Sequence, residues 1–182
     1  MTHDRSPNGP PAPLSAEDRL DIMDAVGGIM LQVDVKDWDK VRRYLMPEVS
    51  TDYTSIFGGD PVTCDSDVFV QGLRSRLPGF DATQHIVTQI SVSGSGDHAM
   101  TISNLRAAHW IESDIWAFGG AYRHTLTRTA EGWRIASLAI EMHYEEGDRA
   151  VRDAAVERMS ARLGMSVEEL TVIGRSQNQV NT

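Results

Sequence analysis

Cysteine and long apolar runs are almost absent from this chain of 182 residues. Cys64 is the only cysteine, so no disulfide can form within the chain and nothing indicates an oxidising compartment. No segment reaches the length of an apolar transmembrane helix, and the N-terminal residues MTHDRSPNGPPAPLS lack the apolar core of a signal peptide. We therefore predict a cytoplasmic protein that has no membrane partner.

Basic residues are also scarce, since 17 Lys and Arg stand against 26 Asp and Glu and the formal net charge is -9. Nucleic-acid binding needs a basic surface, so we expect no nucleic-acid partner. The same excess disfavours highly anionic substrates at long range, although one well-placed arginine could reverse this locally. We predict a small, largely uncharged substrate of apolar, aromatic or alicyclic character.

The length and the hydrophobic content of 41% fit one globular domain. Residues 1–14 are rich in Pro, Asn and Gly and are predicted to form a disordered tail. The predicted α+β domain covers residues 15–145, and residues 146–182 are predicted to form a C-terminal helical extension followed by a polar tail.

The hydrophobic pattern predicts helices first and then a long antiparallel meander. Helices are expected over 16–33, 37–45, 66–77, 148–163 and 166–171. Strands are expected over 48–57, 83–93, 98–112, 115–129 and 132–145. Such an order is typical of an α+β fold in which a curved antiparallel sheet is covered on its concave face by N-terminal and C-terminal helices. We expect the sheet to form a cone-shaped barrel, which leaves room for a cavity.

Four side chains could carry acid–base chemistry in that cavity. His109 shares a predicted strand face with apolar residues, His85 and Tyr53 lie on two other predicted strands, and Asp34 lies at the junction of two helices. A carboxylate that fixes the tautomer of an imidazole creates a general base. A histidine on such a face can equally be a hydrogen-bonded core residue, and spacing alone does not separate the two roles.

Several segments resemble the scytalone dehydratase branch of the nuclear-transport-factor-2-like (SnoaL-like) superfamily, over about residues 15 to 145. They are VDVKDWDKVRRYLMPEVSTDYTS, TQH, NLRAAH and EGWRIASL, in that order along the chain. The resemblance implies that His85 is the general base, that Asp34 orients it, that His109 is a second active-site histidine and that Tyr53 polarises a substrate carbonyl. Val33 stands where that family has a second such tyrosine, and Tyr122 lies near a position that is asparagine in the family.

Three functions are compatible with these residues. The first is a lyase, a cofactor-independent dehydratase of a small hydroxylated cyclic ketone, in which His85 and Asp34 drive acid–base elimination of water. The second is an isomerase or polyketide-type cyclase that uses the same enolate chemistry. The third is a non-catalytic ligand-binding protein or enzyme subunit of the same fold.

The remaining predictions concern ligands and assembly. We expect these residues to contact the substrate: Val33, Trp110, Trp116, Phe118 and Tyr122. No H-x-H, H-E-x-x-H or cysteine cluster is present, so we expect neither a metal nor another cofactor. Ile86, Ile90 and Val92 are expected on the outer sheet face, which favours a homo-oligomer, dimer or trimer, packed through the sheet.

Overall fold

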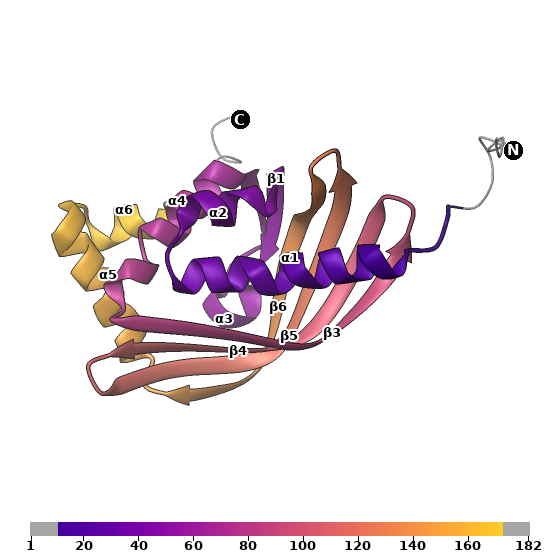
Figure 1. The fold of residues 1–182 in the computed structure, drawn as a ribbon. Helices are drawn as coiled ribbons and strands as arrows, with labels where there is room; N and C mark the ends of the chain where they lie inside the picture. Colours follow the sequence, from indigo (N-terminus) through magenta and orange to yellow (C-terminus); the bar gives the residue numbers. More distant parts are fainter. Residues whose placement is uncertain (1–10, 173–182) are drawn as a thin grey trace, which may run out of the picture.

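The computed structural model describes residues 11–172, which form one curved sheet with helices on its concave side and at one end (Figure 1). The helices are α1 (Ala16–Asp34), α2 (Trp38–Arg43), α3 (Thr54–Phe57), α4 (Ser66–Arg74), α5 (Ala150–Leu163) and α6 (Val167–Val172), with a short 3-10 helix, η1 (Leu77–Gly79). The strands are β1 (Leu45–Asp52), β2 (Val62–Asp65), β3 (Ala82–Ser95), β4 (His98–Ile111), β5 (Asp114–Thr129) and β6 (Gly132–Gly147).

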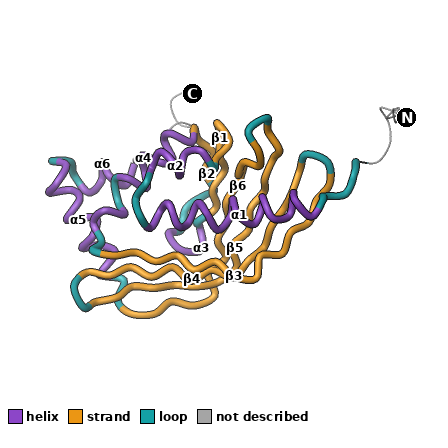
Figure 2. Tube along the Cα trace, viewed as in Figure 1, coloured by secondary structure: helices purple, strands orange, loops and turns teal. Residues whose placement is uncertain are grey.

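The six strands lie in the order β2-β1-β6-β5-β4-β3. Strands β3 to β6 form the predicted antiparallel meander. Strand β1 pairs in parallel with β6 and antiparallel with β2, so the sheet is mixed, and its two edges stay apart instead of closing into a barrel. Figure 2 shows α1 running across the sheet, while the other long helices gather at one end. No helix within residues 11–172 is long and apolar enough to cross a membrane.

Helix α1 begins at a capping box, because the Ser15 hydroxyl accepts from the Asp18 amide and the Asp18 carboxylate accepts from the Ser15 amide. The Asp18 carboxylate also binds Arg128 at 2.6 Å and the Trp133 indole N–H at 3.3 Å. These contacts attach the start of α1 to the ends of β5 and β6. The helix then buries an apolar face against the sheet and ends at Asp34.

The segment before α1 is partly attached to the sheet. The Gly96 amide donates to the carbonyl of Ala12 at 2.8 Å, Pro13 forms an isolated bridge with Ser95, and Leu14 is buried. The rest of the predicted tail, residues 1–10, lies outside the described residues, as does the predicted polar tail beyond residue 172.

The first predicted strand, 48–57, is wrong at both ends. Strand β1 begins at Leu45 and includes Pro47. Proline has no backbone N–H to donate to a neighbouring strand, and it is tolerated here because the pairing with β6 is irregular between Leu45 and Ser50. After Asp52 the chain turns into α3, so Tyr53 precedes a helix. The Ser55 hydroxyl donates to the Ile140 carbonyl at 2.6 Å, which ties α3 to β6.

A β-bulge in β3 changes the predicted outer face. Gln89 has a positive φ of 54°, and the register with β4 shifts between Thr88 and Ser91. The extra residue reverses the alternation, so Ile90 and Val92 pack against the core and only Ile86, at 41% exposure, stays outside. Two of the three residues expected on the outer face therefore lie on the inner one, and the homo-oligomer packed through the sheet stays a prediction.

Candidate active site

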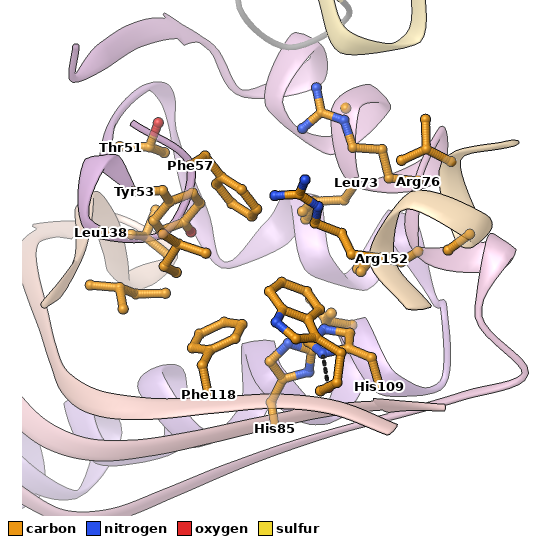
Figure 3. Close-up of a pocket in the computed structure, with 18 of the residues that line it drawn as sticks. Thr51, Tyr53, Phe57, Leu73, Arg76, His85, His109, Phe118, Leu138 and Arg152 are labelled. Atoms are coloured by element: carbon orange, nitrogen blue, oxygen red, sulfur yellow. Dashed lines mark hydrogen bonds between the residues drawn. The ribbon is translucent and has the colours of Figure 1, made fainter. Parts of the chain in front are cut away.

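A cavity of about 550 Å³ opens between the concave face of the sheet and helices α1, α3, α4 and α5 (Figure 3). Its walls are mostly apolar, with Ile29, Met30, Phe69, Leu73, Phe80 and Leu138 among them. His85, His109, Tyr53 and Tyr122 bring polar atoms to it. An apolar cavity with a few converging polar groups is typical of a small-molecule site.

The Asp34 carboxylate and the His85 side chain form a close pair. Asp34 is the last residue of α1, and its Oδ1 lies 2.7 Å from Nδ1 of His85. The same oxygen accepts from the Thr83 hydroxyl at 2.9 Å, and Oδ2 accepts from the His85 backbone N–H at 2.8 Å. Three donors from one end of β3 therefore fix the carboxylate.

This pair has the geometry of an oriented general base. A carboxylate can only accept, so Nδ1 of His85 carries the proton and Nε2 retains its lone pair. Both side chains are mostly buried, and His85 lines the cavity. Burial alone would raise the pKa of Asp34, but the hydrogen bonds and charge of His85 together with the Thr83 hydroxyl lower it overall. Asp34 thus stays ionised beside the imidazole.

His109 is a buried and neutral histidine at the same site. Burial, together with the nearby His85, lowers its pKa to about 3. Its Nδ1 donates to the Trp116 carbonyl at 3.3 Å, and its ring meets that of His85 edge-on at 5.5 Å between centroids. A neutral imidazole that donates from Nδ1 has no proton on Nε2, so His109 has no proton to give from that nitrogen.

Two tyrosine hydroxyls meet at the cavity wall. The hydroxyl of Tyr53 lies 3.4 Å from that of Tyr122, and both residues line the cavity. Burial raises the pKa of Tyr53 to about 12 and that of Tyr122 well above its ordinary value. Both phenols keep their protons at neutral pH, and since only one can donate to the other, at least one O–H is available to a ligand.

Four of the five predicted substrate contacts line the cavity, namely Val33, Trp116, Phe118 and Tyr122. Trp110 does not line it, because it follows His109 on β4 and successive strand residues point to opposite faces. Sequence reasoning overlooked Arg76 and Arg152, which also line the cavity. Arg152 shares a helix face with Ala155 and Val156 at spacings of three and four, a signal that the sequence does contain.

Within the described part of the chain, no group of three or more His, Cys, Asp or Glu side chains could hold a metal ion. The expectation that the protein needs neither metal nor other cofactor stays a prediction.

We predict that buried histidines make the fold sensitive to acid. Burial lowers the pKa of His124, like that of His109, from 6.5 to about 3, and Nε2 of His124 has no partner in the structure. The unfolded chain therefore binds more protons below pH 6.5, and the stability should fall as the pH drops toward 3. Each histidine should contribute up to about 1.4 kcal/mol per pH unit, measured by urea unfolding at several pH values.

His124→Gln should reduce the pH dependence of the free energy of unfolding by up to about 1.4 kcal/mol per pH unit, the contribution of one histidine. This holds whatever the substitution does to stability at neutral pH. His143→Gln is the matched control, because the side chain of His143 is 54% exposed. An unchanged slope in the His124 variant would contradict the prediction.

Comparisons with known proteins agree with this fold. The family described as SnoaL-like domain matches residues 14–139. A "Scytalone dehydratase-like protein" of Claviceps purpurea (strain 20.1) is 29% identical over 129 residues, which cover 63% of this chain and 80% of that protein. The solved structure of the Kfla4162 protein from Kribbella flavida has a TM-score of 0.71 and 29% identity, and the match covers 78% of this chain and 99% of that one.

A more distant structure shares the fold alone. The hexachlorocyclohexane dehydrochlorinase LinA-type3 from Novosphingobium barchaimii LL02 is 15% identical with a TM-score of 0.59, over 74% of this chain and 95% of that one.

Proposed function

Because the chain belongs to the SnoaL-like domain family, we propose that it is a dehydratase that acts on a small hydroxylated cyclic ketone without a cofactor. The contact between Asp34 and His85 carries this proposal, since it leaves Nε2 of a cavity-lining imidazole as a base. The similarity to a protein described as scytalone dehydratase-like supports the elimination of water as the reaction.

The reaction begins with proton transfer to His85. Nε2 of His85 takes the proton from the carbon next to the substrate carbonyl, and the ionised Asp34 stabilises the resulting imidazolium. The carbonyl becomes an enolate, and its oxygen accepts hydrogen bonds from the hydroxyls of Tyr53 and Tyr122. The apolar wall keeps water away, which strengthens these hydrogen bonds.

The second half of the reaction returns the proton. The enolate forms a carbon–carbon double bond as the β carbon–oxygen bond breaks, and Nε2–H of His85 protonates the departing hydroxyl. Water leaves, His85 is neutral again and no oxidant or reductant is consumed. One base that then acts as an acid suffices, which agrees with the neutral state of His109.

The test is turnover of a panel of cyclic β-hydroxy ketones, such as 3-hydroxy-1-tetralone, in deuterated water. Wild-type protein should release water and form the unsaturated or aromatic product, followed by absorbance and mass spectrometry. His85→Ala should lose this activity while its circular dichroism stays that of the wild type. Full activity in that variant would refute the proposal. Exchange of deuterium without loss of water would indicate an isomerase, and binding without either reaction would indicate a non-catalytic protein.

A further inference from the structure

The side of the cavity away from the two tyrosines carries two arginines. Arg76 lies between α4 and η1, and Arg152 lies in the first turn of α5. Both line the cavity on the side opposite Tyr53 and Leu138, and Figure 3 shows the guanidinium group of Arg152 reaching into it with Arg76 above. The proposed dehydration uses neither of them.

The hydrogen bonds of Arg152 leave part of its guanidinium group for a ligand. Its Nε and one Nη both donate to a single oxygen of Asp153, at 2.9 and 2.7 Å. The side chain of Asp153 is 60% exposed, and such an exposed ion pair contributes little. Because a guanidinium has five N–H donors, Arg152 can bind a second acceptor without breaking this pair. Beside it, Arg76 donates to the Leu170 carbonyl at 3.4 Å.

The charges around the cavity differ in how far they are buried. Three carboxylates also line it, those of Asp60, Asp153 and Glu157, and all three residues are exposed. Arg76 and Arg152 are half-buried. Water screens the outer carboxylates, while a contact with a half-buried guanidinium is stronger because fewer water molecules compete. A ligand inside the cavity therefore meets positive charge on this side.

We propose that the substrate carries a carboxylate, which Arg152 binds with Arg76 beside it while the ketone lies at Tyr53, Tyr122 and His85. The planar fork of a guanidinium matches the two oxygens of a carboxylate. This inference rests on the proposed function for the position of the reacting end. It also replaces the expectation of an uncharged substrate, which followed from the net charge of the whole chain.

The test measures binding of two probes of equal shape, 2-naphthoate and the neutral 2-naphthamide, by calorimetry at neutral pH. Wild-type protein should bind naphthoate about tenfold more tightly, the size expected for a charge-assisted hydrogen bond. Arg152→Gln should weaken naphthoate binding by about that factor and leave naphthamide binding unchanged. Arg152→Lys should restore only part of the preference, because it keeps the charge and loses the fork.

Arg162→Gln is the matched control, because Arg162 is an exposed arginine on the same helix, does not line the cavity and changes the net charge equally. It should leave both affinities unchanged. Equal binding of the two probes by wild-type protein, equal losses in Arg152→Gln, or no naphthoate binding at millimolar concentrations would overturn the inference. Dehydration of a ketone by a protein without the carboxylate preference would refute the inference alone. A clear preference without dehydration of any cyclic β-hydroxy ketone, with or without a carboxylate, would refute the proposed function alone.

Discussion

Replacing Asp34 by asparagine is expected to lower kcat by about 10²–10⁴-fold. Asp34 accepts from three donors, the His85 imidazole, the His85 backbone N–H and the Thr83 hydroxyl. A side-chain amide offers one oxygen and one NH₂ group, so in the variant the NH₂ group must face at least one of these donors. If the NH₂ group faces the imidazole, the ring is held in the wrong tautomer, and if it faces the backbone N–H, the two donors push the side chain out of place. In both cases the imidazolium loses its counter-charge. Steady-state kinetics with the ketone found active in the panel measure the effect.

Asp39→Asn is the control for this prediction, because Asp39 is an exposed carboxylate in the first turn of α2. It should leave kcat unchanged. The pH–rate profile separates orientation from a merely structural role, since loss of the counter-charge should move the pH dependence of kcat/KM in folded Asp34→Asn protein. A folded Asp34→Asn variant with wild-type kcat and profile would contradict the assignment of Asp34.

The two tyrosine hydroxyls should prove partly redundant. Tyr53→Phe and Tyr122→Phe should each lower kcat about tenfold, because the remaining hydroxyl still donates to the enolate oxygen. The double variant should lose about 10³-fold, more than the product of the two single effects, because no donor remains. The loss should fall on kcat more than on KM, since the enolate charge develops only in the transition state.

Tyr144→Phe is the matched control, because Tyr144 is exposed and does not line the cavity. Double-variant activity near that of the single variants would show that these hydroxyls do not stabilise the enolate.

Most of the fold was predictable, because β3 to β6 and α1 have strong periodic patterns. The errors lie where tertiary contacts override the pattern. Pro47 lies outside the predicted strand 48–57, yet the structure places it in β1 where the pairing with β6 is irregular. Gln89 gives no bulge signal of its own, so Ile90 and Val92 were expected on the wrong face. A one-residue shift suffices to exchange the faces of a strand.

The sequence allowed most residues of the site to be predicted, but it did not allow the contacts between them to be predicted. The resemblance picked out Asp34 and His85, while the pairing of both carboxylate oxygens with β3 depends on how α1 crosses the sheet. The meeting of Tyr53 and Tyr122 joins residues 69 positions apart and has no sequence signature. Arg152 was overlooked because the net charge of the chain says little about the charge inside one cavity.

The open sheet also has a consequence for how separate molecules meet. Strand β3 is a long edge strand, and unpaired backbone groups at such an edge invite strands of other molecules to add to the sheet. Side chains of α1 already bind this edge, since Asp34 accepts the His85 N–H and Arg19 donates to the Val92 carbonyl at 2.7 Å. The bulge at Gln89 interrupts the edge between them. Asp34, to which we assign the orientation of the base, thus also takes up a backbone donor at the open edge of the sheet.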